Sequence, residues 1–161
     1  MDTQKKIDVL IKIARALNAA DITWAIGGSM LLYLENITTE FNDIDIMVHS
    51  EQADTARVIL LQMGVLIPSE TKDKFRTKTF LEFVIDGVDV DVMAGFVIVS
   101  DGIAHDCALR TEEITGHITI GNEAIPVQPV ALWRKYYALM GNTEKVRLID
   151  ATSRTGSVEG K

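Results

Sequence analysis

The order of apolar and polar positions predicts alternating helices and strands in the first third of the chain. From Ile7 to Leu17 the apolar residues recur every three or four positions, which is the spacing of an amphipathic helix. Residues 23–26 form a short apolar run of strand type, and a helical pattern resumes over 29–35 after two glycines. Residues 43–48 alternate with a period of two, which predicts a strand whose two faces differ in polarity.

Two hairpins and a pair of helices are predicted in the rest of the chain. The predicted elements are a helix over 51–63 with Ser50 as its N-cap, hairpin strands at 79–85 and 88–93, a smaller hairpin of 116–120 and 124–128, and helices over 130–140 and 143–151. The first hairpin turns at Asp86-Gly87, a dipeptide preferred in two-residue turns. This order of elements predicts a mixed α/β (α+β) fold in which helices flank the sheet.

The length of the chain, 161 residues, corresponds to about one domain. We therefore expect a single domain over 1–155, followed by a tail over 156–161 that has too little apolar content to pack. Cys107 is the only cysteine, which excludes a disulfide framework and a cysteine-based zinc site.

The charge balance is acidic, with 23 Asp and Glu against 16 Lys and Arg and a net charge of −7. Because DNA-binding and membrane-surface proteins normally carry a basic face, we expect neither extended DNA binding nor membrane binding. The first ten residues lack the apolar core of a signal peptide, and no run of 18 apolar residues occurs, so we expect a cytoplasmic protein. One basic cluster is better explained as a solvated loop than as a triphosphate site: Lys72, Lys74, Arg76 and Lys78.

Aspartates inside predicted strands are the most informative feature of the sequence. Asp is depleted from strands. Nevertheless, Asp43 and Asp45 stand two positions apart in one predicted strand, and Asp89 and Asp91 do so in another. Residues two apart share a face of the strand, so each carboxylate pair lies opposite an apolar face. If the two strands are neighbours, the like charges destabilise the sheet unless a cation neutralises them. Mg²⁺ is the natural candidate, since it is usually bound by one or two carboxylates plus substrate phosphates.

A half-exposed sheet that happens to carry aspartates on its solvent face is the alternative explanation. One such pair would not decide between the two readings. Two pairs at strand positions make the metal-binding explanation the stronger one.

A second candidate feature is the turn Gly27-Gly28-Ser29, which lies where a short strand passes into a helix. Glycines there let the backbone approach a ligand closely, and the free N–H groups of a helix start can bind phosphate. Ser29 could cap the helix or donate its hydroxyl hydrogen to a phosphate oxygen. By itself the turn is weak evidence, because strand-to-helix turns also use glycine for steric reasons.

Together these two features resemble the nucleotidyltransferase superfamily. The matching stretches are GGSMLLYLENITTEFNDIDIMV, from Gly27 to Val48, and IDGVDVDVM, from Ile85 to Met93. In the superfamily a Gly-Gly/Ser turn precedes an Asp-x-Asp/Glu strand, and a third carboxylate comes from a later strand. The strand at 42–46 is similar to that of aminoglycoside nucleotidyltransferases and of small bacterial and archaeal proteins of this fold. The likeness is looser over 126–149.

The resemblance implies a nucleotidyltransferase-like mixed β-sheet flanked by helices, with a C-terminal hairpin and helix pair. The implied site residues are Asp43, Asp45 and Asp91 for metal binding and catalysis, and Gly27, Gly28, Ser29 and Lys135 for the phosphates. Two Mg²⁺ (or Mn²⁺) ions would bind between the carboxylates and the triphosphate. For Lys135, an exposed lysine on an amphipathic helix is an equally good explanation.

The third carboxylate is ambiguous, because Asp89 and Asp91 share a face of the same predicted strand. Only one of them can occupy the family position. The order of residues after the Asp86-Gly87 turn favours Asp91, which would then bind metal and take a proton from the acceptor.

The resulting hypothesis is a Mg²⁺-dependent enzyme that transfers a nucleoside monophosphate from an NTP to an acceptor hydroxyl or amine and releases pyrophosphate. The acceptor and the preferred NTP are not specified by the sequence. The alternative is a catalytically weak nucleotide-binding protein, or the partner protein of a toxin–antitoxin pair, that retains the fold. The short chain favours this alternative, and the complete carboxylate set opposes it.

Overall fold

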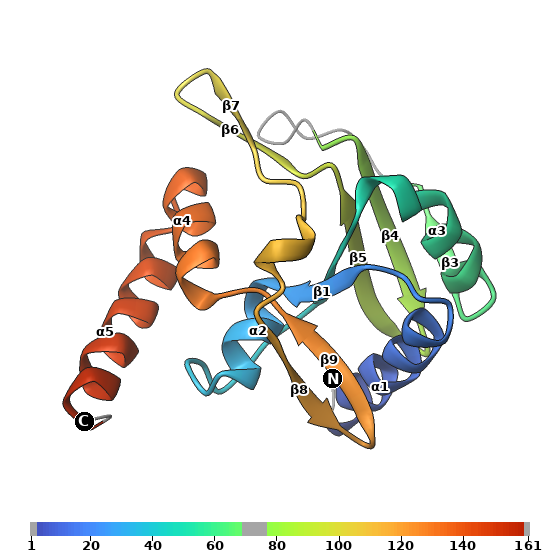
Figure 1. Cartoon of the computed structure of the whole chain (residues 1–161), viewed down its shortest axis with the longest axis horizontal. Coiled ribbons are helices and arrows are strands. Elements are labelled where there is room, and N and C mark those ends of the chain that lie inside the picture. The colour runs from blue at the N-terminus through green and yellow to red at the C-terminus, as the bar shows by residue number, and fades with distance from the viewer. Residues whose placement is uncertain (1–2, 69–76, 160–161) are drawn as a thin grey trace.

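One mixed sheet carries both aspartate strands at its centre. The computed structural model describes residues 3–68 and 77–159, the last seven by backbone only, and its sheet has the strand order β3-β4-β5-β2-β1-β9-β8 (Figure 1). Its strands are β1 (Trp24–Gly27), β2 (Ile44–Val48), β3 (Val65–Ile67), β4 (Thr79–Ile85), β5 (Val88–Ala94), β8 (Gly116–Ile120) and β9 (Glu123–Val127). The pairs β2–β5 and β1–β9 are parallel, and the other pairs are antiparallel.

Helices flank the sheet, as expected, and confirm the predicted class of fold. They are α1 (Thr3–Ala19), α2 (Gly28–Leu34), α3 (Ala53–Leu61), α4 (Val130–Met140) and α5 (Thr143–Glu159), with 3₁₀ turns η1 (Ser50–Gln52) and η2 (Thr111–Glu113). Helix α1 contacts α3, β5 and β9, whereas α4 contacts α2, α5 and the short strand β6 (Val97–Ser100). Within the described residues, no helix is long and apolar enough to cross a membrane.

The central strands divide by face as their period of two predicts. Ile44, Ile46, Val90 and Val92 are fully buried in the core, whereas Asp45 and Asp91, which alternate with them, are half-buried on the opposite face. One face of β2 and β5 is therefore core throughout. The opposite face carries Asp45 and Asp91 and, two positions further along, the buried Met47 and Met93.

The structure differs from the predicted elements at three places. The helix predicted from Glu51 begins with the turn η1, and the side chain that caps this turn belongs to His49: its Nδ1 accepts the Glu51 N–H at 3.3 Å. Strand β3 was not predicted, because its three residues are too few for a detectable alternation. The hairpin of β6 (Val97–Ser100) and β7 (Ile103–Asp106) was not predicted, although Asp101-Gly102 is the same kind of turn signal as Asp86-Gly87.

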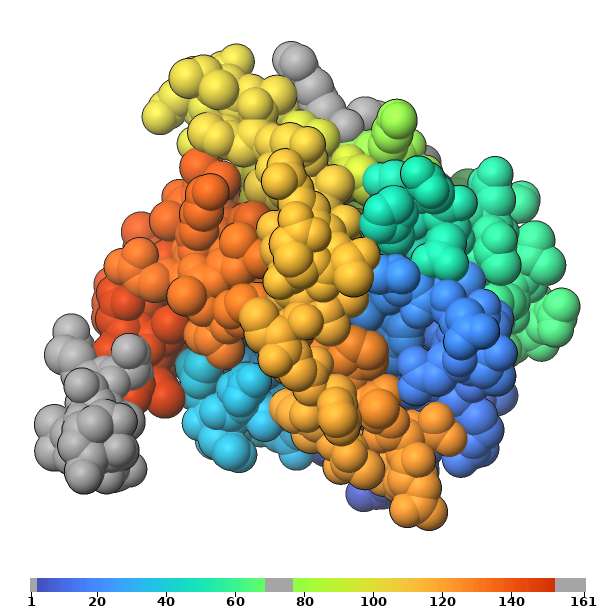
Figure 2. Space-filling view, in the orientation of Figure 1, coloured from blue at the N-terminus to red at the C-terminus, as the bar shows by residue number. Residues whose placement is uncertain are grey.

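The chain from β7 to β8 crosses one face of the molecule. In Figure 2 it forms a continuous gold band between α4 and the N-terminal third of the chain. The β6–β7 hairpin projects beyond the sheet at the top of Figure 1. Of the basic cluster, only Lys78 lies within the described residues.

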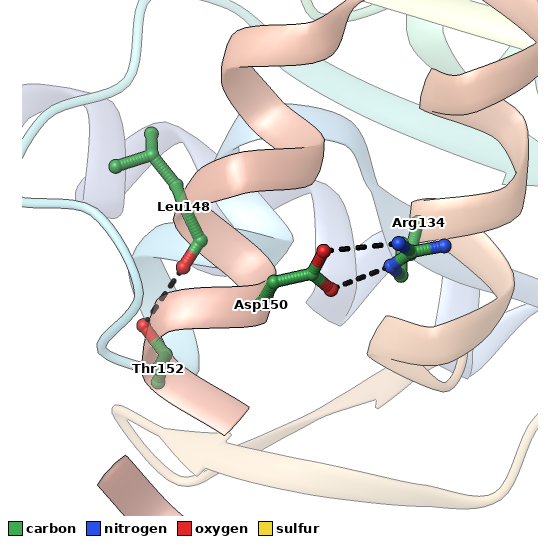
Figure 3. Close-up of polar contacts among 4 residues, drawn as sticks. All are labelled: Arg134, Leu148, Asp150 and Thr152. Carbon is green, nitrogen blue, oxygen red and sulfur yellow. Dashed lines mark hydrogen bonds and ion pairs between the residues drawn. The ribbon is translucent and has the colours of Figure 1, made fainter. Parts of the chain in front are cut away.

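Helix α5 extends to Glu159, well beyond its predicted end at Ala151. The tail expected over 156–161 stays a prediction: 156–159 are described by backbone only, as the end of α5, and 160–161 lie outside the described residues. Helices α4 and α5 are joined by a bidentate ion pair, in which Arg134 Nε and Nη2 donate to the two carboxylate oxygens of Asp150 at 2.6 and 2.9 Å (Figure 3). Within α5, the Thr152 hydroxyl donates to the Leu148 carbonyl at 3.1 Å. Such an exposed pair contributes little stability, but its two bonds orient one helix against the other.

Candidate active site

Three adjacent strands bring three carboxylates into one row. In the parallel register of β2 and β5, Asp45 is the partner of Asp91, and in the antiparallel register of β5 and β4, Asp91 is the partner of Glu82. Paired residues on neighbouring strands point to the same face at about 5 Å. Asp43 precedes β2 by one residue and lies two positions from Asp45. The sheet therefore collects the predicted aspartates from segments 46 residues apart in the chain.

The glycine turn lies directly beside this row. Gly27 is the register partner of Asp45 on the other side of β2. Gly28 has φ +62°, and a Cβ built on it would stand 1.9 Å from Oδ2 of Asp45. A Cβ on Gly27 would stand 2.3 Å from the Trp133 ring. Both positions therefore require glycine because a carboxylate and an indole ring pack against the backbone.

The electrostatics of the row centre on Asp45. Burial raises the pKa of its carboxyl well above the ordinary value, and the charges of Asp91 and Asp43 raise this pKa further. Lys145 lowers it, so this lysine on the first turn of α5 is a cation that acts on the row. The Lys145 backbone N–H donates to Oδ1 of Asn142 at 3.2 Å, so the Asn142 side chain caps the start of α5.

The raised pKa predicts how Asp45→Asn changes stability with pH. The folded protein holds the Asp45 proton more tightly than the unfolded chain, so the free energy of unfolding falls as pH rises from about the ordinary pKa of 3.8 through the raised value. The Asp45→Asn variant has no titrating carboxyl at this position, so its free energy of unfolding does not fall for this reason. Urea denaturation without metal should show the variant gaining stability over the parent as pH increases. A difference that is constant from pH 3 to 8 would contradict this assignment.

Two cavities meet at Asp91. One, here called the aromatic pocket, has a volume of about 180 Å³; it is lined by Gly28, Asp45, Phe80, Asp91, Met93, Phe96, Trp133, Tyr137 and Met140. The other, here called the acidic cavity, has a volume of about 400 Å³; it is lined by Asp43, Ile67, Phe80, Glu82, Phe83, Val84, Asp89 and Asp91. Asp91 is the carboxylate shared by both. The glycine turn lines the first cavity, and most of the acidic side chains line the second.

Asp43 is held by an anchored segment. The buried Lys6 of α1 donates from Nζ to the Phe41 carbonyl at 2.9 Å, and its Nζ lies 5.1 Å from the centre of the Phe41 ring. Lys6, Asp43 and Asp89 also line a smaller cavity of about 230 Å³ beside the acidic cavity. The first helix thereby fixes the chain just before the predicted metal-binding strand.

The structure brings most of the predicted site residues together. Gly27, Gly28, Asp45 and Asp91 adjoin one another, and Asp43 lines the neighbouring acidic cavity. Ser29 is half-buried on α2 and lines neither cavity.

Lys135 is not brought to the site. It is exposed on α4 and lines neither cavity, and its charge acts instead on Cys107, where it opposes the effect of burial, which raises the pKa of the thiol to about 11. The lysine that acts on the carboxylate row is Lys145, ten residues further along the chain. A lysine on the C-terminal helix pair was predicted, but the helix that supplies it was not.

The carboxylate pair suits a divalent cation without forming a complete centre. Across residues 3–68 and 77–159, no three His, Cys, Asp or Glu side chains are already grouped as metal ligands. Asp45 and Asp91 nevertheless face each other as register partners, and their repulsion raises the pKa of Asp45. Mg²⁺ typically takes one or two carboxylates and completes its shell with water and phosphate. The donor set fits such an ion, and metal binding stays a prediction.

The aromatic wall of the site was missed at the level of sequence. Trp133 is a core residue, 2% exposed, yet its ring also lines the aromatic pocket with Tyr137 one helical turn later. The Trp133 indole N–H donates to Oε1 of Gln128 at 2.9 Å, which fixes the plane of the ring. The spacing of these aromatic residues on α4 indicates a buried face but not what it faces.

Comparison with known proteins gives one family and one fold. The sequence matches the family model described as aminoglycoside-2''-adenylyltransferase over residues 9–151. A candidate nucleotidyltransferase from Thermotoga maritima has a similar structure, with a TM-score of 0.74, 23% identity and 96% of each chain covered. ANT(2'')-Ia in complex with adenylyl-2''-tobramycin has a TM-score of 0.63 at 15% identity, covering 96% of this chain and 93% of that one.

A solution structure of the antibiotic-resistance factor ANT(2'')-Ia is similar at a TM-score of 0.56 and 17% identity, covering 99% and 97% of the two chains. At these identities the solved structures establish the fold, and they confirm the nucleotidyltransferase-like architecture expected from the sequence. The comparison with curated proteins gives no match.

Proposed function

This chain belongs to the aminoglycoside-2''-adenylyltransferase family, and from that premise we propose that it transfers a nucleoside monophosphate from an NTP to a hydroxyl group of a cationic, amine-bearing acceptor. The family supports nucleotidyl transfer as the type of reaction. The identity of the donor, the acceptor and the metal dependence are the proposed parts.

The position of Asp91 between the two cavities is the observation that carries this proposal. Nucleotidyl transfer needs a donor site and an acceptor site that meet at one reacting phosphorus. The glycine turn and Asp45 lie on the side of the aromatic pocket, and Asp43, Glu82 and Asp89 lie on the side of the acidic cavity. A carboxylate lining both sides is suitably placed to take a proton from an acceptor as its oxygen approaches the donor.

We assign the donor triphosphate to the side of the glycine turn. Helix α2 begins at Gly28, and Gly27 provides no side chain to cap it, so the first N–H groups of the helix are available to phosphate oxygens. Lys145 adds positive charge near Asp45. Mg²⁺ held by Asp45 and Asp91, with Asp43 as a further ligand, would neutralise the triphosphate and polarise the phosphorus.

The acidic cavity suits an acceptor that carries protonated amines. Four of its lining side chains are carboxylates, from Asp43, Glu82, Asp89 and Asp91, and they would attract such a molecule and orient it. The acceptor oxygen would form a bond to the α-phosphorus while the bond between that phosphorus and the bridging oxygen of pyrophosphate breaks. Asp91 accepts the hydroxyl proton, and pyrophosphate leaves with the bridging oxygen.

The proposal is tested by incubating the protein with each of the four common NTPs, Mg²⁺ and tobramycin or a related aminoglycoside. We expect a product heavier than the acceptor by one nucleoside monophosphate, seen by mass spectrometry, together with an equal amount of pyrophosphate. Removal of the divalent cation with EDTA should abolish both. If the protein binds nucleotide but transfers it to no aminoglycoside and to no component of a cell lysate, the noncatalytic alternative is the correct one.

A further inference from the structure

The aromatic pocket differs chemically from the cavity beside it. Apart from Asp45 and Asp91, the described side chains that line it are apolar or aromatic: Phe80, Met93, Phe96, Trp133, Tyr137 and Met140. The acidic cavity, by contrast, adds Asp43, Glu82 and Asp89 to Asp91. Two cavities that share one carboxylate therefore offer opposite environments.

The walls of the aromatic pocket form one packed cluster rather than isolated rings. Phe96 stacks on Trp133 with ring centres 6.2 Å apart, and Trp133 lies 5.6 Å from Tyr137. Tyr136 packs edge-on against Trp133 at 5.2 Å. Because the cluster is buried and Gln128 fixes the indole, the pocket is preformed, which reduces the entropic cost of binding a flat ring.

The position and lining of the pocket restrict its occupant. A polycationic acceptor finds four carboxylates in the lining of the acidic cavity but two in that of the aromatic pocket, so its charges are better balanced in the acidic cavity. A flat, uncharged ring attached to a phosphate chain fits better. Such a molecule places its ring against the cluster and its phosphates toward Gly28 and Asp45, which line the same pocket.

We propose that the aromatic pocket binds the nucleobase of the donor NTP and selects it by ring size rather than by its hydrogen-bonding edge. This inference rests on the proposed function, since it assumes that an NTP is the donor. Among the described residues that line the pocket, none is an asparagine, glutamine, arginine, serine or threonine whose side chain could read a base edge. Base–aromatic stacking, in contrast, tolerates any base. A purine has the larger ring system and so covers more of the aromatic surface than a pyrimidine. ATP and GTP should therefore bind with similar affinity and both more tightly than CTP or UTP.

Trp133 provides a direct probe of this pocket. The chain has only two tryptophans, and Trp24 lies in the core with its indole N–H bonded to Asn18. In Trp24→Phe, with Mg²⁺ present, ATP and GTP should change the Trp133 fluorescence on binding. Inorganic tripolyphosphate, which lacks a base, should bind without this change. Titration calorimetry on the parent protein provides the affinities independently of the Trp24 substitution.

Tyr137→Leu tests the same inference by affinity. Loss of the ring should weaken ATP binding by about 10-fold or more and leave tripolyphosphate binding unchanged, since stacking on one aromatic residue is worth roughly 5- to 150-fold. Tyr33→Leu is the matched control, because the Tyr33 ring packs on that of Phe41, with ring centres 4.8 Å apart, and does not line the pocket. Unchanged tripolyphosphate binding also shows that the Tyr137 variant is folded.

The outcomes separate this inference from the proposed function. If ATP is used as donor but affects neither Trp133 fluorescence nor the Tyr137 variant, the nucleobase lies elsewhere and only the inference fails. If an apolar acceptor changes the fluorescence while nucleotides do not, the pocket belongs to the acceptor and the inference also fails. If no nucleotide binds at all, both fail.

Discussion

Asp91→Asn is expected to lower turnover by about 100-fold or more, because general base catalysis by a positioned side chain contributes about 10²- to 10⁴-fold. Asp91 is the carboxylate that lines both cavities, and it is the register partner of Asp45. Asparagine has nearly the same shape but cannot accept the acceptor proton, and it is a poorer metal ligand. The measurement is the initial rate of transfer from labelled NTP, with circular dichroism to confirm that the variant is folded.

Asp89→Asn is the matched control for this prediction. Asp89 stands two residues away on the same strand and face, is exposed, and lines the acidic cavity without reaching the aromatic pocket. It should change the rate at saturating acceptor by no more than about 3-fold, which is small against the contribution of a general base, and its main effect should be a higher KM for a cationic acceptor. If Asp89→Asn is the damaging substitution and Asp91→Asn the mild one, the base has been assigned to the wrong position.

Gly28→Ala is expected to abolish transfer and to destabilise the fold. Its Cβ would stand 1.9 Å from Oδ2 of Asp45, so either the carboxylate or the β1–α2 turn must move. The residue also has φ +62°, where a side chain costs about 1–2 kcal/mol in backbone energy. Both the predicted phosphate turn and a predicted metal ligand are displaced by one methyl group. We expect a loss of turnover of about 100-fold or more, since misplacing a reacting group by about 1 Å can cost about that much.

Gly102→Ala separates the effect on the site from the backbone cost. Gly102 has a similar φ of +75° in the β6–β7 turn, and no atom of the described residues beyond its chain neighbours lies within 4 Å of the Cβ it would acquire. Urea denaturation should show a loss of about 1–2 kcal/mol for this control, with normal transfer. Gly28→Ala should lose more stability than the control and nearly all activity. Equal stability and activity in the two variants would mean that close packing of Asp45 against Gly28 is not required for transfer.

The face on which each aspartate lies could be predicted from the sequence. A strand has a period of two, so the apolar positions beside Asp45 and Asp91 determine which face is buried, and the structure has those residues in the core. The Gly-Gly turn was recognised for the same local reason, since a passage from strand to helix restricts the backbone. These are properties of short segments, and short segments carry them in their own pattern.

The β6–β7 hairpin shows where local patterns were available but insufficient. Its turn, Asp101-Gly102, resembles the turn of the predicted hairpin at Asp86-Gly87. The flanking strands have only four residues each, which is too short for a clear alternation. Length, rather than the type of turn, determined which hairpin could be predicted.

The sequence by itself determined the class of fold, and it predicted the aspartates of the candidate site and the turn beside them, but not Glu82. The tertiary structure alone decided that Asp45 faces Asp91, that Asp91 separates an aromatic pocket from an acidic cavity, and that Lys145 rather than Lys135 acts on the row. These relations depend on the parallel register of β2 with β5 and on the orientation of α4 and α5 against the sheet. Both arise from packing between segments far apart in the chain, and no local periodicity encodes such a contact.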